Sequence, residues 1–330
     1  MADYQSQVGR QRLLLIMLIG LLPVSLFIAL VTGSVSISWP DIWSAFSGES
    51  SINQTLIMDL RLPRAISAMV TGAMLALAGV LMQVLLRNPL ADPYILGISG
   101  GAATGALLSM LLGVSGYWLT GSALLGALLS MFIVFGLAHG RGSWTTTRLL
   151  LTGVVVATGW GALISFMLAI APEHGVFGML FWLMGDLGQT EMPVVGIAVI
   201  VIGLMIGIWM ARNLNVLARG EMQASALGVP VKKLRLQIYF LASLLTATAV
   251  TIAGSIGFVG LIVPHMLRLV IGNDHRILIP ASAVAGAILL VLADVIARSI
   301  IAPQQLPVGI ITAMLGVPVF LYLLHRSHRS

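Results

Sequence analysis

Residues Arg212–Arg235 read RNLNVLARGEMQASALGVPVKKLR and form the one charged island in an otherwise apolar chain. Five of the 17 Lys and Arg residues lie in this island, including both lysines, Lys232 and Lys233. Long apolar runs flank it on both sides. A membrane protein that keeps one short basic segment on one side of the bilayer commonly offers it to a soluble partner there, so a docking surface is the first hypothesis.

The composition is that of a polytopic membrane protein. Of 330 residues, 58% are hydrophobic and 8% are charged, and the mean hydropathy is +1.04, whereas soluble domains carry about 25% charged residues. The net charge of +6 comes from bases spread over loops, so nucleic-acid binding is not expected. The chain has no Cys, which excludes disulfides and thiolate metal sites.

Apolar windows long enough to cross a bilayer predict an all-α polytopic protein with ten transmembrane helices in a single domain, 1–330. The first window is too long for a secretory signal. The eighth is the weakest, because it is short and contains Pro264. The predicted spans are 12–33, 64–86, 95–113, 119–138, 149–170, 192–211, 236–254, 257–271, 278–299 and 306–324.

The basic residues orient these spans, because Lys and Arg gather in cytoplasmic loops. With both termini in the cytoplasm, three bases lie outside, namely Arg61, Arg64 and Arg298. The other 14 lie inside: Arg10, Arg12, Arg87, Arg141, Arg148, Arg212, Arg219, Lys232, Lys233, Arg235, Arg268, Arg276, Arg326 and Arg329. The island is therefore predicted to be cytoplasmic, and the three exterior arginines need an explanation.

Small residues and prolines suggest how the spans pack. Gly recurs every four residues at Gly97, Gly101 and Gly105, and Gly72 is followed by Ala76, a spacing that lets helices approach closely. Prolines near or within the spans predict short or broken helices, which are tolerated where protein or a water-filled cavity satisfies the backbone. A solute pathway is one interpretation of these breaks, and kinks that only assist packing are the other.

No motif for enzymatic chemistry is present. A phosphate-binding loop needs Gly-Lys-Ser/Thr, and neither lysine follows a glycine; HExxH and GxSxG are also missing. The chain is not expected to be an enzyme, and no catalytic residue or cofactor is assigned to it. An ion-coupled secondary transporter remains the alternative, but only Asp294 lies inside a span, and its spacing from Arg298 predicts a local ion pair.

Within the island, 214–227 is predicted to be helical, with Leu217, Ala218, Met222 and Ala226 on one side. Gly228 and Pro230 then predict a tight turn into a second helix, held at the interface by Lys232, Lys233 and Arg235. The alternative is an amphipathic connector resting on lipid headgroups.

The segment Gly220-Glu221-x-x-Ala224-x-x-Leu227-Gly228-Val229 resembles the coupling-loop signature of the iron-chelate, haem and cobalamin permease family, the membrane subunits of type II ATP-binding-cassette (ABC) importers. Further motifs match the family in order and spacing, from about residue 10 to 325. They include 61–64 (RLPR), 87–93 (RNPLADP), 96–102 (LGISGGA), 257–265 (GFVGLIVPH), 274–276 (DHR) and 306–309 (LPVG).

The resemblance implies a type II ABC importer permease fold, multi-pass in the inner membrane of a bacterium. It also implies three kinds of partner: a second copy of the chain or a close paralogue, two cytoplasmic ATPase subunits that use the ATP, and a periplasmic or extracellular substrate-binding protein. The segment 212–235 would be the coupling-helix loop. Its ATPase contacts would be Gly220, Glu221, Ala224, Leu227, Gly228 and Val229.

The resemblance also assigns two further sets of residues. Arg61, Arg64 and Arg298 would dock acidic residues of the binding protein; capping of helices or contact with lipid headgroups is the alternative. The cytoplasmic gate would comprise Asn88, Leu90, Thr146 and Thr147, although threonines at this position also cap helices.

The implied cargo is a metal chelate, namely a ferric siderophore, haem or cobalamin. His174 in the segment APEHGVFGM, with Met179 and Met184 nearby, suggests haem, but a solvated His and packing methionines explain it equally. The residues before Phe181-Trp182 include no base, unlike those of several haem and cobalamin relatives. This departure favours a ferric siderophore. No metal site is assigned to the chain itself.

Overall fold

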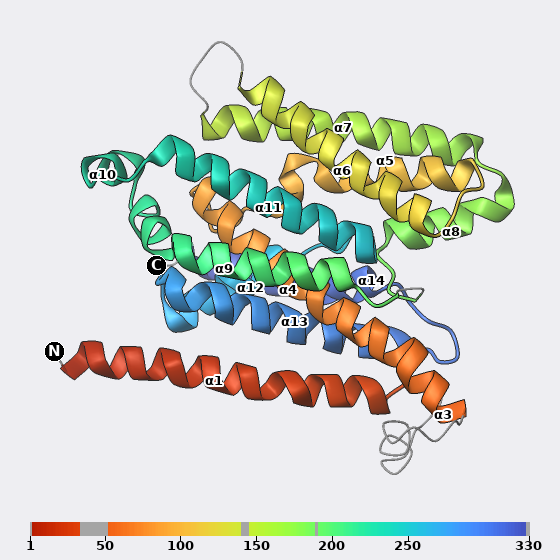
Figure 1. Cartoon of the computed structure of the whole chain (residues 1–330), viewed down its shortest axis with the longest axis horizontal. Helices are drawn as coiled ribbons and strands as arrows, with labels where there is room; N and C mark the ends of the chain where they lie inside the picture. Colours follow the sequence, from red (N-terminus) through yellow and green to blue (C-terminus); the bar gives the residue numbers. More distant parts are fainter. Residues whose placement is uncertain (1, 34–51, 140–144, 189–190, 328–330) are drawn as a thin grey trace.

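The computed structural model describes residues 2–33, 52–139, 145–188 and 191–327, and these are helical throughout their length apart from short connections (Figure 1). Arg141 and Arg329, which the orientation count included, lie outside the described residues. The elements are α1 Ala2–Val31, α3 Ile52–Thr55, the π-helical η1 Leu56–Arg61, α4 Leu62–Leu85, the 3₁₀-helical η2 Pro93–Leu96, α5 Ile98–Leu111, α6 Tyr117–Ala138, α7 Thr146–Ile170, α8 Glu173–Leu183, α9 Val194–Leu217, α10 Glu221–Ala226, α11 Val231–Ala253, α12 Val259–Ile271, α13 His275–Ser299 and α14 Val308–Ser327.

Helix α4 lies at the centre of the bundle, and almost all of its residues are buried. It packs against α13, α11, α12 and α9. Glycines make this packing close: Gly72 lies against the backbone of Gly286 in α13, and Gly79 against that of Gly260 in α12. Small residues at such crossings let backbones approach where larger side chains would hold them apart. The tight bundle predicted from the small-residue spacing is present.

The outer helices present apolar side chains to their surroundings. Leu13 and Ile16 of α1, Val155 of α7 and Trp209 of α9 are all more than half exposed. Seven of the described helices are long and apolar enough to cross a bilayer, and Ile98–Leu111, Val259–Ile271 and Val308–Leu323 are shorter apolar helices. Exposed apolar belts of this extent are expected where lipid replaces water.

Every predicted span overlaps one helix, although the limits differ. Two helices extend into the island: α9 continues to Leu217, and α11 begins at Val231. Helix α8 replaces the exterior loop expected around His174. Pro172 occupies the N-cap of this helix, a position that proline tolerates because its missing N–H is not needed there.

Two helix interruptions at membrane depth find protein partners for their polar groups. After α11, the chain turns through residues 254–258 into α12, and the backbone N–H of Ile256 donates to the Tyr94 hydroxyl at 3.0 Å. Tyr94 lies in η2, which leads into α5, and Ser99 Oγ of α5 lies 2.9 Å from Ser255 Oγ. The two breaks therefore satisfy each other, as irregular backbone away from water requires.

Both chain ends and α10 lie at one end of the bundle, on the left of Figure 1, while α3 lies at the other. The ends of α9 and the start of α11 flank α10, so the charged island forms part of this end. The end that carries α10 is called the island end below, and the end that carries η1 is called the opposite end.

The contact between α4 and α12 provides a test of the bundle. A Cβ on Gly79 would overlap the carbonyl oxygen of Gly260, which is backbone and has no room to move. Gly79→Ala is expected to destabilise the protein by about 2 kcal/mol or more, as overpacking does, measured as a lower melting temperature in detergent. Gly136→Ala on α6 is the matched control, because a Cβ there meets nothing within 4 Å; equal melting of the two variants would contradict the packing argument.

Candidate functional site

Helix α10 is a single short helix between two turns that require glycine. Gly220 precedes it with φ +136°, and Gly228 follows it with φ +78°, both in regions that L side chains rarely adopt. Two hydrogen bonds close its C-terminus, from Val229 N to the Ala224 carbonyl at 2.9 Å and from Gly228 N to the Ser225 carbonyl at 3.0 Å. This is a Schellman motif, with Gly228 in the position where glycine is preferred.

The side chains of α10 divide into an attached side and an exposed side. Ala224 is fully buried against the bundle, and Val229 is half-buried. Met222 and Leu227 are 89% and 71% exposed. The expected apolar face was therefore wrong in detail: Leu217 packs inside, while Ala218, Met222 and Ala226 face outward. Two large apolar side chains on an exposed, rigid turn are typical of a surface that a partner covers.

Glu221 and Arg235 join α10 to the first turn of α11. Arg235 Nη1 lies 3.0 Å from Glu221 Oε1, and Arg235 Nη2 donates to Thr146 Oγ1 at 3.4 Å. The interface anchor expected at Arg235 is corrected, because this side chain is buried, whereas Lys232 and Lys233 are exposed. Arg235 thus connects α10, α11 and α7 at one point. The sequence offered no signal for this link, because Thr146 is 89 residues away.

The four predicted gate residues lie on two segments at the island end. Asn88 is exposed and accepts a hydrogen bond from Leu90 N at 2.9 Å, which forms a tight turn after α4. Thr146 and Thr147 begin α7, but the residue that caps this helix is Thr145, whose hydroxyl accepts from Arg148 N at 3.3 Å. Thr146 and Arg87, the neighbour of Asn88, line one cavity of about 500 Å³ with Glu221. The gate assignment stays a prediction.

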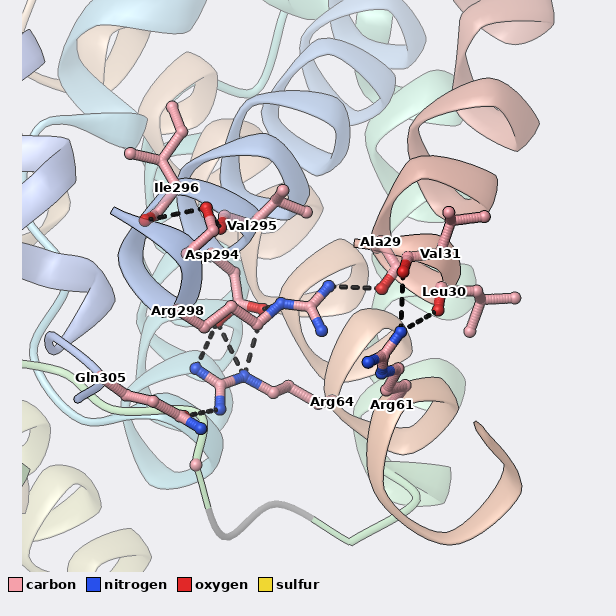
Figure 2. A network of polar contacts seen from close by, with 12 residues as sticks. Ala29, Leu30, Val31, Arg61, Arg64, Asp294, Val295, Ile296, Arg298 and Gln305 are labelled. Atoms are coloured by element: carbon pink, nitrogen blue, oxygen red, sulfur yellow. Dashed lines mark hydrogen bonds and ion pairs between the residues drawn. The ribbon is translucent and has the colours of Figure 1, made fainter. Parts of the chain in front are cut away.

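The three arginines predicted to lie on the exterior side of the membrane gather at the opposite end of the bundle (Figure 2). All three are buried, at 7%, 8% and 5% exposed for Arg61, Arg64 and Arg298. Arg61 Nη1 donates to the carbonyls of Leu30 and Val31 at 2.6 and 2.9 Å. Each has protein acceptors in the described residues, and the docking role assigned to the three stays a prediction.

Asp294 is the acid that holds this group together. The predicted ion pair with Arg298 is present, with Arg298 Nε 3.4 Å from Asp294 Oδ2. Arg64 adds a two-pronged contact, with Nη2 at 2.8 Å and Nε at 2.9 Å from Asp294 Oδ1. Arg64 Nη1 also donates to Gln305 Oε1 at 2.6 Å, and Arg298 Nη2 donates to the Ala29 carbonyl. The network ties α1, α4, α13 and the segment after α13 together (Figure 2).

Among the described residues, the guanidinium groups of Arg64 and Arg298 share one carboxylate, that of Asp294. Backbone carbonyls in the last turn of α1 accept hydrogen bonds from Arg61 and Arg298. These carbonyls have no partner within the helix, and the helix dipole favours cations at a C-terminus. The i, i+4 spacing of Asp294 and Arg298 was visible in the sequence. The contact with Arg64 spans 230 residues and was not.

The residues suggested for haem contact are not brought together. His174 is exposed on α8, whereas Met179 is 1% exposed and packs with Leu107 and Met167. Within the described ranges, no three His, Asp or Glu side chains gather in a way that could hold a metal ion.

The helical bundle with broken, glycine-packed helices and an exposed short helix at one end defines a multi-pass membrane permease of the ABC transporter class. The cobalamin import system permease BtuC of Halobacterium salinarum is 42% identical over 299 residues, covering 88% of this chain and 80% of that protein. The hemin transport system permease HmuU of Yersinia pestis is 37% identical over 309 residues, covering 90% and 91%.

A solved structure described as an inward-facing, metal-chelate type ABC transporter superposes with a TM-score of 0.85 at 33% identity, covering 94% of this chain and 98% of that one. The model of the FecCD transport family matches residues 21–326. The chain belongs to the FecCD transport family.

Removal of the shared acid tests the network at the opposite end. Asp294→Asn leaves two buried guanidinium groups without their counter-ion, so we expect a loss of about 3 kcal/mol in stability, measured by chemical or thermal unfolding in detergent. Asp59→Asn is the control, because Asp59 is an exposed acid of η1 at the same end. Similar melting of Asp294→Asn and the wild type would show that the network contributes nothing to the fold.

Proposed function

We propose that this chain is the membrane-spanning subunit of an ABC importer, and that 212–235 is the loop that couples it to ATPase subunits. The observation that carries this proposal is α10, a rigid helix with Met222 and Leu227 exposed and its ends set by Gly220 and Gly228. The chain has no phosphate-binding loop of its own, so ATP would be used by a partner.

The proposed assembly contains two such subunits, either identical or paralogous, with two cytoplasmic ATPases at the island end and a binding protein at the opposite end. Ten spans with both termini in the cytoplasm, in the inner membrane of a bacterium, complete the proposal. The common position of both termini and α10 at one end supports this orientation, as does the excess of basic residues there.

The proposed cargo is a metal chelate. The relatives named above are permeases for cobalamin and hemin, and the similar structure is described as of the metal-chelate type. These names leave ferric siderophore, haem and cobalamin open, and they add no support to the siderophore preference. An ion-coupled secondary transporter has no support from them.

The proposed mechanism is alternating access driven from α10. ATP binding would draw the two ATPases together and move α10, and hydrolysis would reset it. The ion pair of Glu221 with Arg235, and the contact of Arg235 with Thr146, would carry this movement into α11 and α7. The gate residues Thr146 and Thr147 begin α7, so motion of α10 would reach the gate through one side chain.

Leu227→Asp tests the coupling assignment. Leu227 is 71% exposed, so the charge should leave the fold and melting temperature unchanged. A buried, unpaired carboxylate at the ATPase contact should reduce assembly and ATP-dependent chelate uptake about tenfold or more, which corresponds to about 1.4 kcal/mol. Copurification of the ATPase and uptake into proteoliposomes are the measurements. Arg212→Gln, an exposed change outside the motif, is the control; normal uptake with Leu227→Asp would refute the assignment.

Docking of the binding protein through Arg61, Arg64 and Arg298 requires an exchange of partners, because these side chains are buried. A carboxylate of the binding protein would replace the Leu30 and Val31 carbonyls at Arg61, or would compete with Asp294 for Arg64 and Arg298. Docking would then loosen the end of α1 from α4 and α13. The buried network would thus transmit the arrival of the binding protein into the bundle.

Arg61→Gln tests this docking without disturbing Asp294. We expect the affinity for the binding protein to fall about tenfold at low salt, with a smaller difference at high salt because added ions screen the charge. Surface plasmon resonance on nanodiscs at two salt concentrations is the measurement. Arg10→Gln, an exposed base on α1 near the other end, is the control. Equal affinity of Arg61→Gln and the wild type at low salt contradicts the docking role.

A further inference from the structure

A cavity of 510 Å³ opens at the island end, beside α10 but distinct from its exposed side. The last turns of α4 and α9, helix α12 and the first residue of α13 surround it. The charged residues that line the cavity are Arg87, Arg219, Arg268 and Asp274, and the side chain of His275 also lines it. Asn88 of the predicted gate also lines this cavity, but neither the coupling assignment nor the gate assignment gives a role to its arginines.

The charge of the lining is positive. Asp274 is already occupied, because it accepts hydrogen bonds from Asn215 Nδ2 at 2.8 Å and Arg276 N at 3.0 Å and so caps α13. Burial raises the pKa of Asp274, but these hydrogen bonds and the charges of Arg276 and His275 lower it further, so this carboxylate is ionised at neutral pH. One carboxylate therefore faces three guanidinium groups.

Two of these guanidinium groups remain available to a ligand. Arg268 donates to Gln83 Oε1 at 2.7 Å. Arg87 and Arg219 are exposed, and within the part of the chain that the structure describes neither makes a hydrogen bond or ion pair through its side chain. Both therefore present unused donors at the mouth of a concave, positively charged site.

The backbone of Arg87 is an independent observation. Arg87 has φ +50°, and α4 ends in the hydrogen bonds Asn88 N to the Gln83 carbonyl and Arg87 N to the Val84 carbonyl, each at 3.2 Å. This is the same Schellman motif that ends α10, where the corresponding residue is Gly228. Arginine thus occupies a position for which glycine is the favoured residue. A strained residue that persists at such a position is commonly retained for its side chain.

His275 supplies a group of a different kind. Asn215 Oδ1 accepts from His275 N at 2.8 Å and lies 2.6 Å from His275 Nδ1, which places the ring proton on Nδ1. The Nε2 atom is then a hydrogen-bond acceptor, and among the described residues it is buried without a partner. A ligand in the cavity can satisfy it with a hydroxyl group.

We propose that this cavity binds a phosphate group, held by Arg87 and Arg219, with Arg268 adding charge and His275 Nε2 accepting from a P–OH or neighbouring hydroxyl. Guanidinium groups match the oxygen spacing of phosphate in a two-pronged contact. The source is either an anionic lipid headgroup or a soluble phosphate compound. The site is independent of the proposed importer function, but it adjoins it, because Arg87 and Arg219 also line the cavity next to Glu221.

Two binding measurements on the full-length permease distinguish the sources. In detergent, the melting temperature is followed with increasing inorganic phosphate against sodium chloride of equal ionic strength. In nanodiscs of phosphatidylcholine with or without phosphatidylglycerol, native mass spectrometry counts the lipids retained. Stabilisation by phosphate supports a soluble source, and selective retention of phosphatidylglycerol alone supports a headgroup.

The double variant Arg87→Gln, Arg219→Gln should weaken the observed binding about tenfold or more, because each loses a charge-assisted contact. Arg212→Gln, an exposed base of the same island that does not line the cavity, should bind as the wild type does. Arg87→Gly should melt at a higher temperature than the wild type while binding less well, a combination that a structural role for Arg87 does not produce.

The proposal is overturned if the wild type shows neither phosphate stabilisation beyond that of chloride nor a preference for phosphatidylglycerol. It is also overturned if Arg212→Gln loses as much binding as the double variant, because the effect would then be one of general surface charge. Arg219→Gln alone provides the same readout should the double variant fail to fold.

Discussion

Backbone contacts between glycines hold α4 against α12 and α13, and this close approach positions both polar ends of the protein. Gly72 meets Gly286 and Gly79 meets Gly260, so at these two crossings the backbone of α4 lies directly against that of its neighbours. Its 24 residues span about 36 Å. One end presents Arg64 to Asp294, and the other presents Gln83 to Arg268. A loss of the glycine contacts would displace both sites together.

The basic side chains at the two ends of the bundle differ in burial and in pairing. At the opposite end, Arg61, Arg64 and Arg298 are buried and satisfied by Asp294, Gln305 and the last carbonyls of α1. At the island end, Arg87, Arg219 and the lysines are exposed, and Arg235 alone of the island bases is buried. Buried charges that are paired can be released only when a competing charge arrives. The opposite end therefore suits a response to a docking partner, and the island end suits continuous contact with anionic groups.

Much of the architecture could be predicted because hydropathy is a property of consecutive residues. Each of the ten windows overlaps a helix, and the Gly-Glu signature located α10 to within a few residues. The predictions that were wrong concern the limits and the type of single segments. An exterior loop was expected around His174, but Glu173–Leu183 is helical, and α9 and α11 extend beyond the predicted spans 192–211 and 236–254.

The sequence by itself determined the class of protein, the approximate helical spans and the family, because these follow from apolar runs and from motifs read in order. Only the tertiary structure decided which polar side chains from distant segments meet. Asp294 and Arg64 lie 230 residues apart, and Arg235 and Thr146 lie 89 apart. The spacing of small residues predicts that helices pack closely, but which residues then meet depends on which helices are neighbours in the bundle, and the chain order does not state this.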